Sequence, residues 1–182
     1  MTLAAEILTL YESRGSQAYF GERVSMAEHG LQAAHFASAE GAPEELVVAA
    51  LLHDIGHLLE EVPETIEEWT CDAHHEEVGA RWLAQHFDAA LSEPVRLHVS
   101  AKRYLCATDA DYLARLSAAS VHTLKLQGGP MSARELTHFE SQRFWREALR
   151  VRRWDDQGKV AGLRTLALRD YAPLIDRISR GC

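Results

Sequence analysis

Few cysteines, no long apolar run and a shortage of basic residues set the first limits on what this chain can be. The three cysteines, Cys71, Cys106 and Cys182, are odd in number and form no C-x-x-C pair. This excludes a disulfide framework and a zinc finger, and it indicates a reducing compartment. No apolar run approaches the roughly 18 residues that cross a bilayer, and residues 1–15 predict a short amphipathic helix rather than a signal peptide. We therefore expect a cytoplasmic protein that does not associate with membranes.

Basic residues are outnumbered, 19 against 27 acidic ones, which gives a net charge of −8. A dedicated nucleic-acid binder is excluded, because such proteins carry a basic stripe that neutralises phosphates. The nearest basic cluster, Arg150, Arg152 and Arg153, is interpreted as a solvated helix face. An anionic substrate would need positive charge supplied locally, by a metal or by a few placed cations.

A strand pattern is also missing, since no segment alternates convincingly between apolar and polar residues. The 182 residues, 47% hydrophobic and 25% charged, are typical of one globular domain over residues 1–182. Gly41 and Pro43 separate two predicted helices, and Ser132 with Glu135 predicts a capping box. We expect an all-α bundle of about eight helices, over approximately residues 2–13, 24–40, 44–60, 74–87, 92–105, 109–126, 132–153 and 166–179.

The stretch LLHDIGH, residues 51–57, puts His53 and Asp54 at the end of an apolar run. An ionised carboxylate buried without a partner costs several kcal/mol, so Asp54 needs a cation, a donor network or a metal. Neighbouring helix residues point about 100° apart. The two side chains therefore cannot grip one ion as a pair, but they can straddle two ions with the carboxylate as a bridge.

Other helical segments carry further histidines and carboxylates on apolar faces. The pattern reads H…HD…H…H…D, with six donors on five segments. His74 competes with its neighbour His75, and Asp156 competes with Asp155, for a place in the set. The candidate metal ligands are His29, His53, Asp54, His75, His98 and Asp155.

This order resembles the HD-domain superfamily of metal-dependent enzymes, and the two extra histidines narrow the match to its dinuclear members. From Tyr19 to Lys159 the chain resembles the HD-domain mixed-valence diiron oxygenases that break the carbon–phosphorus bond of 1-hydroxyphosphonates. Myo-inositol oxygenase is a more distant relative. The resemblance implies two iron ions, Fe(II) and Fe(III), held by the six candidates with Asp54 as the bridge. Its H-E dipeptide favours His75, and its spacing to Lys159 favours Asp155.

The same resemblance implies roles beside the metals. Tyr19 matches a tyrosine that closes one iron in the resting enzyme, and Glu22 matches its companion near the substrate amine. His57, Lys102 and Ser120 match residues that contact the substrate and its phosphonate. Helical spacing is consistent with two of these roles, because Lys102 and His57 each lie one turn after a predicted ligand.

The small residue Gly56 is expected to leave room beside the metals. The implied reaction uses dioxygen and gives phosphate with either glycine betaine, from (R)-1-hydroxy-2-(trimethylamino)ethylphosphonate, or glycine, from 2-amino-1-hydroxyethylphosphonate. A separate hydroxylase is expected to supply the 1-hydroxyphosphonate. A quaternary ammonium group is bound well by aromatic faces and carboxylates. The trimethylated substrate is favoured because the chain has aromatic or acidic side chains that could surround such a group at Tyr19, Glu22, Glu67, Glu68, Trp69 and Asp72.

Two rival functions fit an HD domain. A nucleotide phosphohydrolase with one Mn, Co or Mg ion would need a basic cluster for a polyphosphate, and it would not need His75, His98 or Tyr19. A binding or regulatory module that has lost catalysis would show a broken ligand set, whereas this set is complete.

Overall fold

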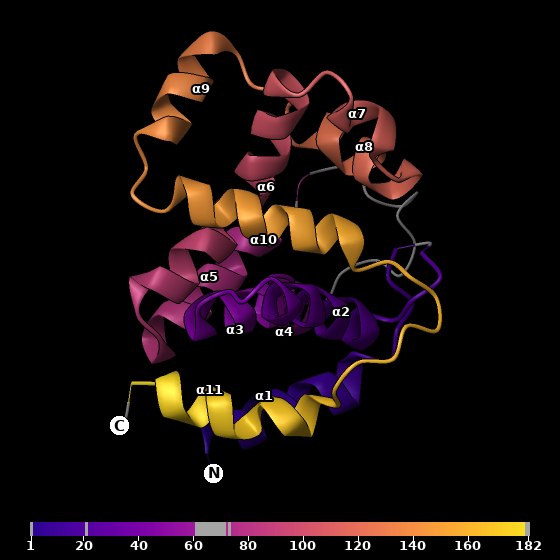
Figure 1. Cartoon of the computed structure of the whole chain (residues 1–182), viewed down its shortest axis with the longest axis vertical. Helices are drawn as coiled ribbons and strands as arrows, with labels where there is room; N and C mark the ends of the chain where they lie inside the picture. Colours follow the sequence, from indigo (N-terminus) through magenta and orange to yellow (C-terminus); the bar gives the residue numbers. More distant parts are fainter. Residues whose placement is uncertain (1, 21, 61–71, 73, 181–182) are drawn as a thin grey trace.

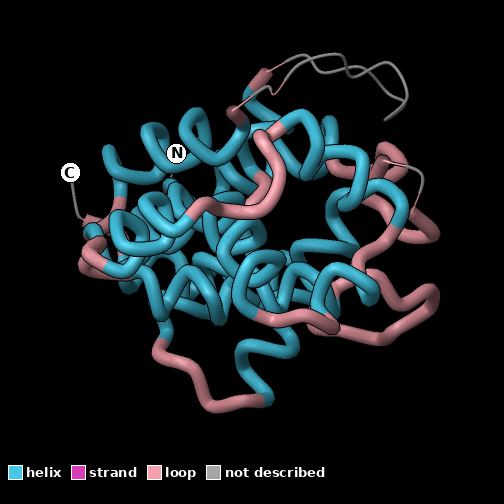
Figure 2. Tube along the Cα trace, turned by 90° about the horizontal axis from the view of Figure 1, so that it is seen from above, coloured by secondary structure: helices cyan, strands magenta, loops and turns pink. Residues whose placement is uncertain are grey.

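The computed structural model describes residues 2–20, 22–60, 72 and 74–180. Within these ranges the protein is all-α, with eleven α-helices, one short 3-10 helix and no strand beyond an isolated bridge between Ala18 and Ser25 (Figure 2). The helices are α1 (Leu3–Arg14), α2 (Met26–Ala39), α3 (Glu44–Leu52), α4 (Ile55–Leu59), α5 (His75–His86), α6 (Ala89–Thr108), α7 (Tyr112–Arg115), α8 (Ala118–Leu126), α9 (Ala133–Glu140), α10 (Trp145–Gln157), η2 (Leu168–Tyr171) and α11 (Ala172–Ile178).

Helix α10 crosses the middle of the molecule, as Figure 1 shows. Helices α2 to α5 lie on one side of it and α7 to α9 on the other, while α6 packs against α10 and also against α3 and α5. Helices α1 and α11 lie side by side at the far edge, near both chain ends, where the Ala4 amide donates to the Asp176 carboxylate at 3.0 Å. The centre of the fold is therefore where α10 meets α2, α3 and α6.

The apolar run predicted as core is core. Every residue of the stretch 46–52 in α3 is buried, and Leu51 and Leu52 are fully so. Ile7 of α1 and Ile175 of α11 join the same cluster from the opposite edge. Burial of this kind stabilises the fold by about 25 cal/mol per Å² of apolar surface. The following residues, 53 and 54, are thus attached to a fully buried part of the bundle.

The predicted helix 44–60 breaks at His53 and Asp54. Asp54 has φ −101° and ψ 13°, outside helical values, and α4 starts again at Ile55. Gly56 lies where α4 and α5 meet: a Cβ there would lie 2.0 Å from the carbonyl oxygen of His75. The expectation that Gly56 leaves room beside the metals is wrong, since the room it leaves is for the backbone of α5.

Three other predicted helices are divided as well, so that eleven α-helices and one 3-10 helix in the described ranges replace about eight. Ser117 begins α8 by accepting from the Ser120 amide, so residues 109–126 form two helices. Residues 132–153 separate into α9 and α10, and 166–179 into η2 and α11. The capping box of Ser132 and Glu135 is confirmed.

None of the helices within residues 2–20, 22–60, 72 and 74–180 has the length and apolar character needed for a bilayer crossing. The predicted helix over residues 2–13 is α1, which packs its apolar side into the core.

Candidate metal centre

All six predicted ligands lie in one buried cluster, in two groups of three. Within each group the donor atoms lie within 4.8 Å of one another. The deep group consists of His29, His53 and Asp155. The pocket group consists of Asp54, His75 and His98, all three of which line a pocket beside the cluster.

The helix break places His53 in the deep group and its neighbour Asp54 in the pocket group. In the deep group, Nε2 of His29 lies 3.0 Å from Nε2 of His53 and 3.3 Å from Oδ1 of Asp155. Asp155 comes from the last turn of α10, far from the other two in sequence. Three separate segments are thus required to build this group.

Asp54 divides its two oxygens between the groups. Oδ1 lies 3.2 Å from Nε2 of His75 and 3.5 Å from Nε2 of His98. Oδ2 lies 3.4 Å from Nε2 of His53 and 3.6 Å from Nε2 of His29. A carboxylate placed in this way can give one oxygen to each of two cations, as the sequence predicted for a bridge.

The hydrogen bonds of the imidazoles fit metal binding. A backbone carbonyl accepts only, so an imidazole Nδ1 facing one carries the proton and leaves the Nε2 lone pair free in the neutral ring. Three of the four histidines are held in this way: His29 Nδ1 to Gly158 O at 2.9 Å, His53 Nδ1 to Ala50 O at 2.8 Å and His98 Nδ1 to Val95 O at 2.7 Å.

Lone pairs that face each other repel unless a cation lies between them. In the deep group two Nε2 atoms face each other at 3.0 Å, and in the pocket group His75 and His98 do so at 3.2 Å. Asp155 Oδ1 is buried and has no hydrogen-bond partner among the described residues. Imidazole and carboxylate donors suit iron, manganese or zinc. The donor set therefore fits a pair of metal ions, although its role as ligands stays a prediction.

In the metal-free chain, protons take the place of such cations. Burial lowers the pKa of His53, but Asp54 and then Asp155 outweigh it and raise this pKa to about 9. Burial likewise lowers the pKa of His75, and Asp54 and Glu76 raise it above its ordinary value. Burial opposes ionisation of Asp54, yet the neighbouring histidines hold its pKa well below the usual range. The cluster attracts positive charge strongly.

Tyr19 lies against the cluster, as predicted. Its hydroxyl donates to Oδ2 of Asp54 at 2.8 Å, and its ring stacks on His29 with centroids 3.9 Å apart. Burial, followed by Asp54 and Asp155, raises the pKa of the phenol well above its ordinary value, so it is a neutral donor. The loop between α1 and α2 holds it, through the Tyr19 amide that donates to Val24 O at 2.9 Å.

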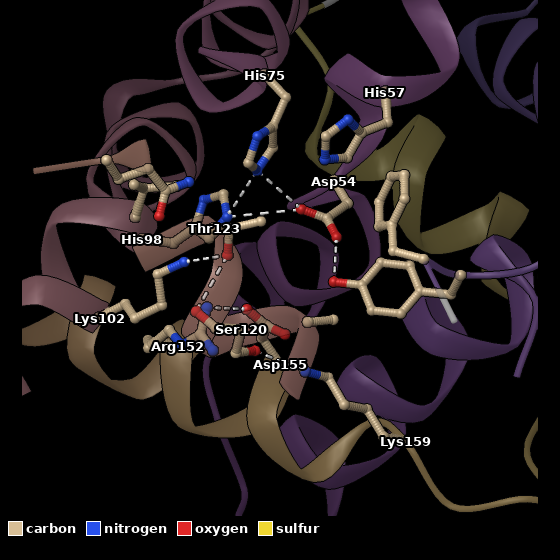
Figure 3. A pocket seen from close by; sticks show the side chains of 15 residues that line it. Asp54, His57, His75, His98, Lys102, Ser120, Thr123, Arg152, Asp155 and Lys159 are labelled. Atoms are coloured by element: carbon tan, nitrogen blue, oxygen red, sulfur yellow. Dashed lines mark hydrogen bonds and ion pairs between the residues drawn. The ribbon is translucent and has the colours of Figure 1, made fainter. Parts of the chain in front are cut away.

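Cations line the pocket opposite the pocket group (Figure 3). Lys102 is 3% exposed and its Nζ donates to Thr123 Oγ1 at 2.9 Å. Lys159 donates to Ser120 Oγ at 3.1 Å. Lys102 and Ser120 were predicted to be here, whereas Lys159 and Thr123 were not assigned to substrate.

Arg152 corrects an interpretation of the sequence. It was placed on a solvated face with Arg150 and Arg153, but it is 4% exposed and lines the pocket. It pairs with Asp155 Oδ2 at 2.7 Å and also with Asp156. The spacing of three and four residues to two carboxylates was a signal for this pairing.

The remaining predicted residues divide by position. His57 is buried, lines the pocket and stacks on His75 with centroids 3.9 Å apart. Glu22 does not line the pocket; its Oε1 lies 3.7 Å from Lys159 Nζ. Glu67, Glu68 and Trp69 lie outside the described residues, and Asp72 lies 3.4 Å from His74 Nδ1.

The structure separates the competing neighbours. The side chain of His74 is 68% exposed and lies outside both donor groups, whereas that of His75 is 8% exposed. Asp156 pairs with Arg152 and accepts from the Tyr112 hydroxyl, away from the cluster. Geometry therefore agrees with the choice of His75 and Asp155.

Comparisons with known proteins agree with this arrangement. Residues 24–119 match the HD domain family. The chain is 47% identical over 169 residues to a [1-hydroxy-2-(trimethylamino)ethyl]phosphonate dioxygenase (glycine-betaine-forming) from Leisingera caerulea, covering 93% of this chain and 86% of that one. It is 47% identical over 156 residues to a hydroxymethylphosphonate dioxygenase from Gimesia maris, covering 85% and 78%.

A third relative, an uncharacterized protein of Acanthamoeba polyphaga mimivirus, is 38% identical over 156 residues, covering 85% of this chain and 71% of that one. Five of the six donors lie within the matched HD segment, and Asp155 lies beyond it. The family match, the order of the donors and the carboxylate between the two donor groups agree: this chain belongs to the HD-domain family and is a close relative of its phosphonate dioxygenases.

Proposed function

We propose that this protein is an oxygen-dependent enzyme that cleaves the carbon–phosphorus bond of a 1-hydroxyphosphonate. The observation that carries the proposal is the position of the bridged donor groups: Asp54 connects them beside a pocket that also presents Lys102, Arg152 and Lys159. A dianionic phosphonate needs such cations in a chain of net charge −8. Both curated relatives named as dioxygenases act on phosphonates.

The deep group and the pocket group would hold two iron ions, as an Fe(II)/Fe(III) pair, with Tyr19 against Asp54. Bound there, the pair supplies dioxygen activation and Lewis-acid contacts to substrate oxygens. The net reaction balances without an external reductant: R–CH(OH)–PO₃²⁻ + O₂ gives R–COO⁻ + HPO₄²⁻ + H⁺. Carbon 1 loses four electrons, and dioxygen takes up the same four.

The chain's own side chains would position the phosphonate. Lys102 and Lys159 line the pocket, and their ammonium groups donate to the hydroxyls of Thr123 and Ser120, respectively. A bound anion can replace each hydroxyl as the acceptor. Burial, followed by the nearby Arg152, lowers the pKa of Lys102 to about 7. An incoming dianion would restore the charge of this lysine, which gives a strong contact in a water-poor site.

Tyr19 and His57 would hold the two sides of the donor cluster. The Tyr19 phenol stays protonated and donates to Asp54 Oδ2. The tyrosine could therefore move away from that oxygen without becoming charged. Burial and then the charge of His75 lower the pKa of His57, so its ring stays neutral and supports His75 by stacking. Glu22, beside Lys159, would lie near the substrate amine.

The substrate we favour is (R)-1-hydroxy-2-(trimethylamino)ethylphosphonate, which would give glycine betaine. The rings of Tyr19 and Phe20 line the pocket, and aromatic faces bind quaternary ammonium groups well. The two relatives of equal identity act on different hydroxyphosphonates, so the N-substituent has to be tested. A separate hydroxylase would supply the 1-hydroxyl group.

The unit that carries out this reaction would be one HD domain over residues 1–182. One apolar core includes residues from α1 to α11, and the deep group needs Asp155 from α10.

The test is dioxygen uptake and phosphate release by the iron-loaded protein, with three substrates side by side: the trimethylated compound, its amino analogue and hydroxymethylphosphonate. We expect equal molar uptake and release, with the highest kcat/KM for the trimethylated compound. Turnover of a nucleotide with Mn or Mg in the absence of dioxygen would instead identify a phosphohydrolase. No uptake and no phosphate with any of the three would refute the proposal.

A further inference from the structure

The four histidines of the two donor groups differ in what holds their second ring nitrogen. In three of them Nδ1 faces a backbone carbonyl oxygen, at 2.7 to 2.9 Å. His75 is the exception, because its Nδ1 has no hydrogen-bond partner among the described residues. The carboxylate of Glu76 lies close to this nitrogen, with Oε2 3.6 Å away.

Glu76 is buried, which is unusual for a glutamate. It is 7% exposed, and its Oε2 accepts no hydrogen bond from any described group. A buried acceptor and a buried donor are therefore left facing each other, slightly beyond hydrogen-bond distance. Closing this gap needs a movement of about 0.5 Å, and it would satisfy two buried groups at once.

Two other parts of the His75 ring already have partners. His57 stacks on one face, and Nε2 points to Asp54 Oδ1 at 3.2 Å. We infer that Glu76 is a positioning residue: its carboxylate accepts from His75 Nδ1, fixes the tautomer that presents Nε2, and strengthens the pocket group's hold on a metal ion. Such carboxylate–histidine pairs raise the basicity of the ligating nitrogen. This inference rests on the metal centre of the proposed function.

A structural explanation for Glu76 can be separated from this one. Acidic residues in the first turn stabilise a helix through its dipole, and Glu76 shares the first turn of α5 with Glu77. The Glu77 side chain is 47% exposed and lies 3.8 Å from Arg96. It supplies the dipole contact without burial, and so it provides a matched control of equal charge on the same turn.

A second alternative explanation for the buried Glu76 carboxylate involves His74. Asp72, His74 and Glu76 form a third group of potential donors, and Glu76 Oε1 lies 3.9 Å from His74 Nδ1. If Glu76 served that group, removing His74 would have the same effect as removing the Glu76 carboxylate.

The experiment compares Glu76→Gln, Glu77→Gln and His74→Ala with the unsubstituted protein. Each is loaded anaerobically with Fe(II), the metal content per chain is measured, and iron is then withdrawn by titration with a chelator. For Glu76→Gln we expect one of two equivalents to be lost at about 10- to 100-fold lower chelator concentration, the usual cost of removing a group that orients a metal ligand. The second iron equivalent of Glu76→Gln should be released at the same chelator concentration as in the unsubstituted protein. Both equivalents of Glu77→Gln and of His74→Ala should also be released as in the unsubstituted protein.

The readout needs no turnover, so the inference and the proposed function fail in different ways. If the unsubstituted protein holds two equivalents and Glu76→Gln releases both normally, the inference is overturned and the metal centre stands. It is also overturned if Glu77→Gln or His74→Ala matches Glu76→Gln, or if both equivalents weaken together in a variant whose thermal unfolding is also altered. If the unsubstituted protein does not hold two equivalents, both proposals are overturned.

Discussion

The deep group and the pocket group have the same number of donors but different surroundings. His29 and His53 of the deep group are fully buried, and Arg152 pairs with Asp155 at 2.7 Å. The pocket group borders the pocket, with Asp54 and His75 each 7% exposed. All three donors of the pocket group thus line the pocket and offer open positions to a ligand, whereas the deep group reaches the pocket through Asp155 alone. Catalytic metal sites need such open positions, while structural sites are closed.

The change that should break both groups at once is Asp54→Ala. One oxygen faces each group, so we expect both ions to be lost and activity to fall by more than the roughly 100-fold that limits most outer-shell substitutions. Metal analysis and phosphate release measure this. Asp88→Ala, at a carboxylate whose side chain is 81% exposed, is the control. Retention of one full equivalent by Asp54→Ala would show that Asp54 is not a bridge.

Substitution of Arg152 should affect the deep group selectively. Arg152→Met leaves the buried carboxylate of Asp155 and the partly exposed one of Asp156 without the guanidinium that pairs with them, which should lower the free energy of unfolding by about 3–5 kcal/mol. Urea denaturation of the metal-free protein measures the loss. The exposed neighbour Arg153 provides the control, because Arg153→Met should change the free energy of unfolding by less than about 0.5 kcal/mol. Equal losses in both variants would contradict a specific role for Arg152.

The pocket side can be tested without disturbing the metals. Lys102→Met should raise KM for the hydroxyphosphonate by about 10- to 100-fold, the cost of one charge-assisted hydrogen bond, and leave the metal content unchanged. Steady-state kinetics with parallel metal analysis gives both values. Lys125→Met, at an exposed lysine of α8, should leave KM as it is. A fall in metal content with Lys102→Met would move this lysine from substrate binding to the metal centre.

The smallest expected effect is that of a single pH unit on metal affinity. Burial lowers the pKa of His53, yet Asp54 and Asp155 raise it to about 9 in the metal-free chain, so below that pH a metal must displace a proton. Affinity should therefore increase by about tenfold per pH unit for each displaced proton, from roughly pH 6 up to 9. Calorimetry in buffers of different ionisation enthalpy counts the protons released. An affinity that is flat over this range would contradict the raised pKa.

Periodicity predicted the helical segments, although four of them are divided, and donor order together with the family resemblance selected six donors that lie in one cluster. They succeeded because apolar spacing reports which face of a helix is buried, and a histidine or carboxylate on that face needs a partner. The interruption at His53 and Asp54 was not predicted, since it contains no proline, and the helix that follows it packs closely on α5, which is distant in the sequence. Arg152 was misplaced for a similar reason: charged neighbours suggested solvent, but the buried Asp155 determined its position.

Gly56 shows that a residue can control a metal site without donating to it. Its missing side chain lets α4 approach the His75 carbonyl, where even one methyl group would lie 2.0 Å from the oxygen. A substitution there would act as a wedge against the helix that carries His75. In a screen of random variants for activity, substitutions at position 56 would therefore be as damaging as substitutions of the metal-binding candidates. A map of sensitive positions would include residues that set the distance between helices as well as residues that take part in the chemistry.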